Sequence, residues 1–298
     1  MQEGPVDAAT PPGEPAPGAP VLAEWIRDLL ASVHATRVRN LHELSTRIED
    51  EVLSWDDMRM AQALQALYSG GRQLHFALLR PAWWQRLLAR HRAAFRRFAA
   101  AADHMDEAAA AVKQEAESLD ALFGEHNRRA ARLFLEFESE SRELALQVEQ
   151  GVGWLQPMCE DINRQRAKGG SDRRLGALAE AAQSYTQTFK RLEHVSSMAH
   201  DIRVRGAAIL GRRGALLAQV GADMDSFHMR WTRHVGDLAD AVRRMVTPLP
   251  GIGKAIEAHD DAMKRLEAAL DACGALQGEE HFLARQLEAL RETLAERP

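Results

Sequence analysis

The chain has 298 residues, a formal net charge of −5 and an aromatic content of 6%. Ala, Leu, Arg and Glu are abundant and are strong helix formers, whereas β-branched runs are nearly absent, which argues against a β-sheet. Apolar runs are only a handful of residues long, far short of the roughly 20 that cross a bilayer. These totals favour a soluble, cytoplasmic, all-α protein and give no indication of a membrane-spanning one.

The start of the chain is rich in proline. Six of the eleven prolines lie within the first twenty residues, and such a segment buries little apolar surface, so we expect residues 1–20 to form a disordered tail. No charged segment followed by an apolar one opens the chain, and we therefore expect no signal peptide. Residues 21–298 are expected to form a single elongated helical domain.

Helical spacing of apolar residues begins after this tail. A first helix is predicted from Leu22 to about Trp55, and a second, shorter one up to Gly70-Gly71. Pro81 suits the first turn of the helix that follows.

The most informative pattern is a proline-free stretch, 82–150, in which apolar residues recur in alternating steps of four and three. An average step of 3.5 residues places these side chains on one stripe of a helix, which we call the heptad seam. At 1.5 Å per residue this helix is roughly 100 Å long, so it must lie along other helices. We expect it to end near Gly151-Val152-Gly153, with Pro157 beyond it and a short helix over 158–167. The seam consists of Trp84, Leu88, His91, Phe95, Phe98, Ala102, Met105, Ala109, Val112, Ala116, Leu119, Phe123, His126, Ala130, Leu133 and Phe137.

A second long helix with a matching seam is predicted over about 173–246, and a last helix from Lys254 to about Ala295. Because the two long helices are nearly equal in length and joined by a short connection, antiparallel packing is the natural solution. The predicted fold is therefore all-α, an elongated antiparallel helical bundle or coiled-coil hairpin with two very long helices.

The sequence offers no set of residues for catalysis, for a cofactor or for a metal ion. No two of the twelve histidines have the i,i+3 or i,i+4 spacing that places ligands on one helical face. Gly251-Ile252-Gly253-Lys254 lacks the earlier glycine of a phosphate-binding loop. His91, His126 and His234 lie on the seams, where a polar residue most simply sets the register between helices.

One local signal stands out, a basic band between Met58 and Ala102 that contains no acidic residue. In a helix starting at 82, tryptophans and phenylalanines occupy one face and arginines the other, which is typical of a helix at a membrane interface or of a partner-binding helix. We predict that this band binds an anionic membrane surface or a protein partner. Its predicted binding residues are Arg80, Trp83, Trp84, Arg86, Arg90, Arg96 and Arg97; the arginines of the whole band are 59, 72, 80, 86, 90, 92, 96 and 97.

Other interpretations remain open at this point. The arginines of the band could pair with acidic helices of the same fold, which would make the protein a purely structural coiled-coil scaffold in a larger assembly. Binding to nucleic-acid phosphates is a disfavoured use of the same arginines. A third hypothesis is a thiol-dependent, oxyanion-handling enzyme that uses Cys159 or Cys273, which are too few and too far apart for a disulfide framework.

Several segments together resemble the toxic anion resistance family, the TelA-like tellurite resistance proteins. The similar segments begin with Pro81-Ala-Trp-Trp-Gln-Arg-Leu-Leu and continue with Leu119-Asp120-Ala-Leu122-Phe123 and Asn127. The matches after these are Arg191, Leu192, Ile202, Arg203 and Trp231. The resemblance covers roughly Arg80 to the C-terminus, but the chain has His200-Asp201 where the family has Pro-Gln.

This resemblance implies a stress-response protein that contributes to tolerance of tellurite, and it implies no established reaction. Since no residues support catalysis or a cofactor, we expect a cytoplasmic protein that acts by binding rather than by catalysis. Taken with the basic band, the resemblance favours peripheral attachment at the inner face of the membrane, and it is compatible with an oligomer.

Overall fold

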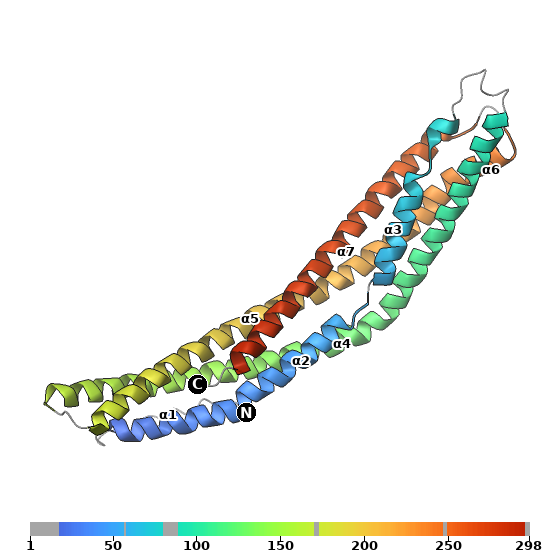
Figure 1. Cartoon of the computed structure of the whole chain (residues 1–298). Coiled ribbons are helices and arrows are strands. Elements are labelled where there is room, and N and C mark those ends of the chain that lie inside the picture. Colours follow the sequence, from blue (N-terminus) through green and yellow to red (C-terminus); the bar gives the residue numbers. More distant parts are fainter. Residues whose placement is uncertain (1–17, 57, 80–88, 170–172, 247–248, 296–298) are drawn as a thin grey trace. The chain divides into compact units, whose positions relative to one another are not determined.

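The computed structural model describes residues 18–56, 58–79, 89–169, 173–246 and 249–295, and of residues 78 and 89–91 the backbone alone. Every element within these ranges is helical, and they contain no strand (Figure 1). The all-α fold with two very long helices is thereby confirmed. The elements are α1 Ala19–Val33, the π-helix η1 His34–Val38, α2 Arg39–Leu53, α3 Met58–Arg72, the 3₁₀ turn η2 Phe76–Leu79, α4 Ala89–Ala167, α5 Arg173–Ser226, the π-helix η4 Phe227–Gly236, α6 Asp237–Arg243 and α7 Ile252–Ala295.

The expected end of the first long helix near Gly151 is wrong. Helix α4 runs for 79 residues, through Gly151 and Pro157, to Ala167, and it includes the separate short helix expected over 158–167. Glycine costs about 1 kcal/mol and proline about 3 kcal/mol in a helix interior. Each apolar side chain buried beyond Gly151 contributes about 1.5–3 kcal/mol, so packing outweighs propensity. The seam continues in four-three steps through Phe137, Ser141, Leu144, Val148, Gly151, Leu155, Met158 and Ile162, all of them buried.

Gly151 has its own reason to lie inside the helix. A methyl group in its place would overlap the ring of Phe189 on α5, so the absence of a side chain lets the two helices approach closely. The first helix also begins earlier than expected, because Ala19 and Pro20 already form the first turn of α1. The rest of the predicted tail, residues 1–17, lies outside the described residues.

The chain forms two compact units, each built from segments distant in sequence. The first unit contains residues 1–45, 136–201 and 288–298, and therefore the hairpin between α4 and α5. The second unit contains residues 46–135 and 202–287, and therefore the end of α2, α3, α4 up to residue 135, α5 from residue 202, η4, α6 and most of α7.

Within each unit α4 and α5 run antiparallel, as predicted. In the second unit Phe134 lies against Gly206 and Phe123 against Gly214, and Lys113 Nζ lies 2.9 Å from Asp225 Oδ1. The contact positions rise along α5 as they fall along α4. In the first unit Ser141 pairs with Ser196 in the same sense.

The heptad seam of α4 is confirmed as the buried stripe wherever its side chains are described. Met105, Val112 and Phe137 are completely buried, and Phe123 is the one half-buried member. Trp84 and Leu88 lie outside the described residues, and the side chain of His91 is not described. His126 is buried on the seam, as expected of a polar residue that sets register.

Candidate functional site

The structure describes only part of the predicted binding band. Arg80, Trp83, Trp84 and Arg86 lie outside the described residues. The backbone of Arg90 belongs to the first turn of α4, but its side chain is not described. The remaining two members, Arg96 and Arg97, lie on α4 with exposed side chains.

Three arginines of the first turns of α4 face solvent: Arg92, Arg96 and Arg97. Phe95 and Phe98, on the other face of the same turns, are buried in the second unit. Within the described ranges none of the three guanidinium groups forms an ion pair, in contrast to Arg243 and Arg265 of the same unit. At these three residues the described structure therefore shows no ion pair that would support neutralisation of the band by acidic helices of the same fold.

The residues that follow α6 carry exposed apolar side chains, and one of them, Met245, lines the same hollow as Arg92 and Arg96. Met245 is 46% exposed and Val246 is 43% exposed. Met245 has a φ of 55°, in the left-handed region that glycine normally occupies at the end of a helix. Its N–H donates to the carbonyl of Val242 at 3.1 Å, and the N–H of Val246 donates to that of Ala241 at 3.0 Å, which closes the helix as a Schellman motif.

A groove of about 320 Å³ runs between α4 and the end of α6. Arg92, Arg96 and Met245 line it, and so does Arg243, which is held by Asp103 of α4 and by Asp240 at 2.5 Å. We name the set Arg92, Arg96, Arg97, Arg244, Met245 and Val246 the α4–α6 surface, and this hollow the α4–α6 groove. The α6 part was not predicted from the sequence, although the run Arg243-Arg244-Met245-Val246 combines the same cationic and apolar residue types as the band.

The residues that match the toxic anion resistance family are mainly core residues. Leu192 and Ile202 are buried, whereas Arg191 and Arg203 are half-buried. Arg191 and Leu192 belong to the first unit, and the other three matches belong to the second.

The fifth match, Trp231, is buried within the π-helix η4, where it stacks on Phe227 at a centroid distance of 4.6 Å. Its indole N–H donates to Nδ1 of His259 at 3.3 Å. Trp231 therefore packs η4 against α7, and within the described structure it does not present a surface to a ligand.

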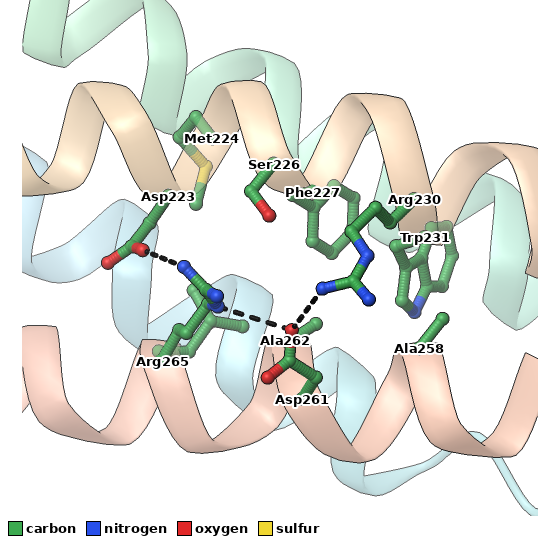
Figure 2. A pocket seen from close by; sticks show the side chains of 11 residues that line it. Asp223, Met224, Ser226, Phe227, Arg230, Trp231, Ala258, Asp261, Ala262 and Arg265 are labelled. Atoms are coloured by element: carbon green, nitrogen blue, oxygen red, sulfur yellow. Dashed lines mark hydrogen bonds and ion pairs between the residues drawn. The ribbon is translucent and has the colours of Figure 1, made fainter.

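The hollow beside Trp231 is shown in Figure 2. Asp223 accepts a hydrogen bond from Arg265 at 3.0 Å, and Asp261 accepts one each from Arg265 and Arg230 at 3.3 Å. These contacts tie α5 and η4 to α7. The remaining space is about 10 Å³, which is the size of one water molecule, so this hollow is too small for an organic ligand.

The second unit also contains a buried charged cluster around Arg213 of α5, whose side chain is fully buried. Its guanidinium donates to Glu280 of α7 at 2.8 Å and to the carbonyl of Val52, near the end of α2, at 2.6 Å. It lies 3.1 Å from Nε2 of His126 on α4. One side chain thus joins four helices, which is a structural role.

The charge of Arg213 fixes the proton position on His126. A guanidinium can only donate, so Nε2 of His126 must accept and the proton must sit on Nδ1. That nitrogen lies 3.2 Å from Oε1 of Glu51 on α2. Burial, assisted by the Arg213 and Arg129 cations, lowers the pKa of His126 below its ordinary value of 6.5, while Glu51 opposes this shift.

Stability should therefore fall in mild acid. Burial also lowers the pKa of His259, and burial together with Arg191 lowers that of His34. Because these folded-state pKa values lie below 6.5, the unfolded chain takes up protons first. The stabilisation is full above pH 6.5 and is lost as the pH falls towards the folded-state values. The melting temperature, followed by circular dichroism, should be lower at pH 5.5 than at pH 7.5.

The matched variant for this test is His259→Gln. Glutamine keeps an acceptor for the Trp231 indole but does not titrate, so this variant should show a smaller loss between the two pH values. An unchanged pH dependence in the variant would contradict the assignment to His259.

The two cysteines lie in different environments. Cys159 on α4 is half-exposed, and Cys273 on α7 is buried. Among the described residues no cluster of His, Cys, Asp or Glu could hold a metal ion, and no helix there is long and apolar enough to cross a membrane.

Comparisons with known proteins found no matching family model, no similar curated protein and no similar solved structure. The resemblance to the toxic anion resistance family therefore stays a prediction that rests on the quoted segments alone.

Proposed function

We propose that this chain is a non-enzymatic, cytoplasmic interaction protein that docks on an anionic membrane surface through the α4–α6 surface. The observation that carries the proposal is the combination of exposed arginines without ion pairs in the described structure and of exposed apolar side chains next to them. Arginines approach the anionic headgroups while Met245 and Val246 enter the interfacial layer, as at membrane-binding amphipathic surfaces.

The backbone at Met245 supports this proposal. A left-handed conformation costs a residue with a side chain about 1–2 kcal/mol relative to glycine. Met245 adopts that conformation, and its large apolar side chain is 46% exposed. Strain of this kind is concentrated at functional sites, and membrane docking would use the side chain that it exposes.

The two other hypotheses lead to different expectations. In a structural scaffold the arginines of α4 would contact a protein, and lipid would not bind. In a thiol-dependent enzyme Cys159 or Cys273 would react, although Cys273 is shielded from solvent. A role in tellurite tolerance, expected from the family resemblance, would in our proposal be exerted from the inner face of the membrane.

Flotation of the full chain with vesicles of phosphatidylcholine and phosphatidylglycerol tests the proposal. The wild-type chain should float at low salt and less at raised salt, because salt screens exposed charges. Each arginine near an anionic surface contributes about 1 kcal/mol. Arg92→Gln/Arg96→Gln should therefore weaken binding by about 2 kcal/mol, or about 30-fold.

The matched control is Arg164→Gln/Arg166→Gln, which removes the same charge from exposed positions in the last turn of α4. This control should float like the wild-type chain. Absence of flotation at every salt concentration would overturn the proposal and favour the scaffold. Equal losses in both variants would show that net charge, and not the α4–α6 surface, drives binding.

A further inference from the structure

The α4–α6 groove is lined by two kinds of residue. Arg92 and Arg96 are exposed and lie one helical turn apart, so both guanidinium groups reach the same side of α4. The apolar part of the lining consists of Phe95, Ala99, Ala100, Val242 and Met245. Charge and apolar surface therefore adjoin within one hollow.

The charges within the groove are unevenly compensated. Arg243 forms ion pairs with Asp103 and Asp240, which fixes the end of α6 against α4. Arg92 and Arg96 have no ion pair within the described ranges, and Asp103 is the one acidic residue of the lining. Two cationic groups are thus left to bind an anion, and paired guanidiniums suit the oxygen atoms of a phosphate.

We propose that the α4–α6 groove binds the headgroup of one anionic phospholipid, with its phosphate between Arg92 and Arg96. This inference rests on the proposed function and adds a site for one lipid headgroup to a surface that otherwise attaches to the membrane through exposed charge and exposed apolar side chains. The glycerol and the first methylene groups lie against Ala100 and Met245, the exposed apolar side chains of the lining. The volume of about 320 Å³ is at the lower end of the range for ligand pockets, which suits a headgroup but not whole acyl chains.

Binding of a soluble lipid separates this site from general attraction to a charged surface. The probe is dihexanoyl-phosphatidylglycerol, titrated below its micelle concentration into the full chain and followed by calorimetry. The wild-type chain should bind it. Ala100→Leu places extra methyl groups in the groove without changing any charge, and it should weaken binding about tenfold or more.

The control for the added volume is Ala111→Leu, an exposed position on α4 that does not line the groove. This variant should bind the probe like the wild-type chain, and circular dichroism should show both variants folded. On vesicles Ala100→Leu should retain salt-dependent flotation, because Arg92, Arg96 and Arg97 remain.

The possible outcomes distinguish the two proposals. A wild-type chain that floats but does not bind the soluble lipid, or an Ala100→Leu variant that binds it normally, would overturn the groove site and leave surface docking intact. Binding of the soluble lipid without flotation would support the groove and overturn membrane docking.

Discussion

Replacing Arg213 with Met should lower the free energy of unfolding by about 3–5 kcal/mol, the cost of breaking a buried ion pair by removing one partner. The guanidinium is fully buried and donates to Glu280 and to the carbonyl of Val52. Without the guanidinium, the buried Glu280 carboxylate has no cation beside it. The carbonyl of Val52 and Nε2 of His126 also lose their hydrogen-bond donor. Urea unfolding, with the midpoint and the slope measured separately, checks this result.

The neighbouring residue provides the matched control. Arg212 pairs with Glu279 as Arg213 pairs with Glu280, but the side chain of Arg212 is 60% exposed. An exposed pair contributes about 0–1 kcal/mol, so Arg212→Met should change stability little. Equal effects of the two substitutions would show that burial of the Arg213 pair is not what makes it costly to break.

A double variant separates the pair from the cluster around it. Arg213→Met/Glu280→Leu removes both charges and replaces them with apolar side chains of similar size. Because replacing a buried ion pair with apolar residues is often neutral or stabilising, the double variant should recover a large part of the loss. If the double variant does not recover stability, the loss comes mainly from the contacts of Arg213 with Val52 and His126.

Introducing a methyl group at Gly206 should destabilise the second unit by about 1–3 kcal/mol, the usual cost of overpacking a core. Gly206 lies on α5, and a Cβ there would overlap the ring of Phe134 on α4, which is buried. The ring has little freedom to move in a close-packed interior. The change in free energy of unfolding of Gly206→Ala, measured in urea, checks the prediction.

Helix propensity alone predicts that replacing glycine with alanine stabilises a helix. The control must therefore measure the effect of propensity by itself. Gly211 lies on the same helix with open space around the position of a Cβ. Gly211→Ala should therefore stabilise the protein by about 0.5–1 kcal/mol. Phe134→Leu should reduce the penalty of Gly206→Ala through the pairwise interaction of the two sites. Stabilisation by both alanine substitutions would contradict the close approach of α4 and α5 at Gly206.

The helical class, the buried stripe of α4 and the antiparallel arrangement of the two long helices can all be predicted from the amino-acid sequence. These features follow from local rules, because a 3.5-residue period forces one apolar face and a short connection forces the return of the chain. Met105, Val112 and Phe137 were placed on the seam by spacing and are fully buried. The candidate surface overlaps in part with the predicted band, since both include Arg96 and Arg97, which are exposed.

The tertiary structure decided what depends on partners distant in sequence. Gly151 and Pro157 appeared to end a helix, but the packing of Phe189 and the continued seam carry α4 to Ala167. Arg213 gave no signal in the sequence because its partners lie on three other helices. Likewise the basic start of α4 can be recognised in the sequence. Its position next to Met245 arises only when α6 packs against α4. Propensity and period act along one helix, and contacts between helices decide the rest.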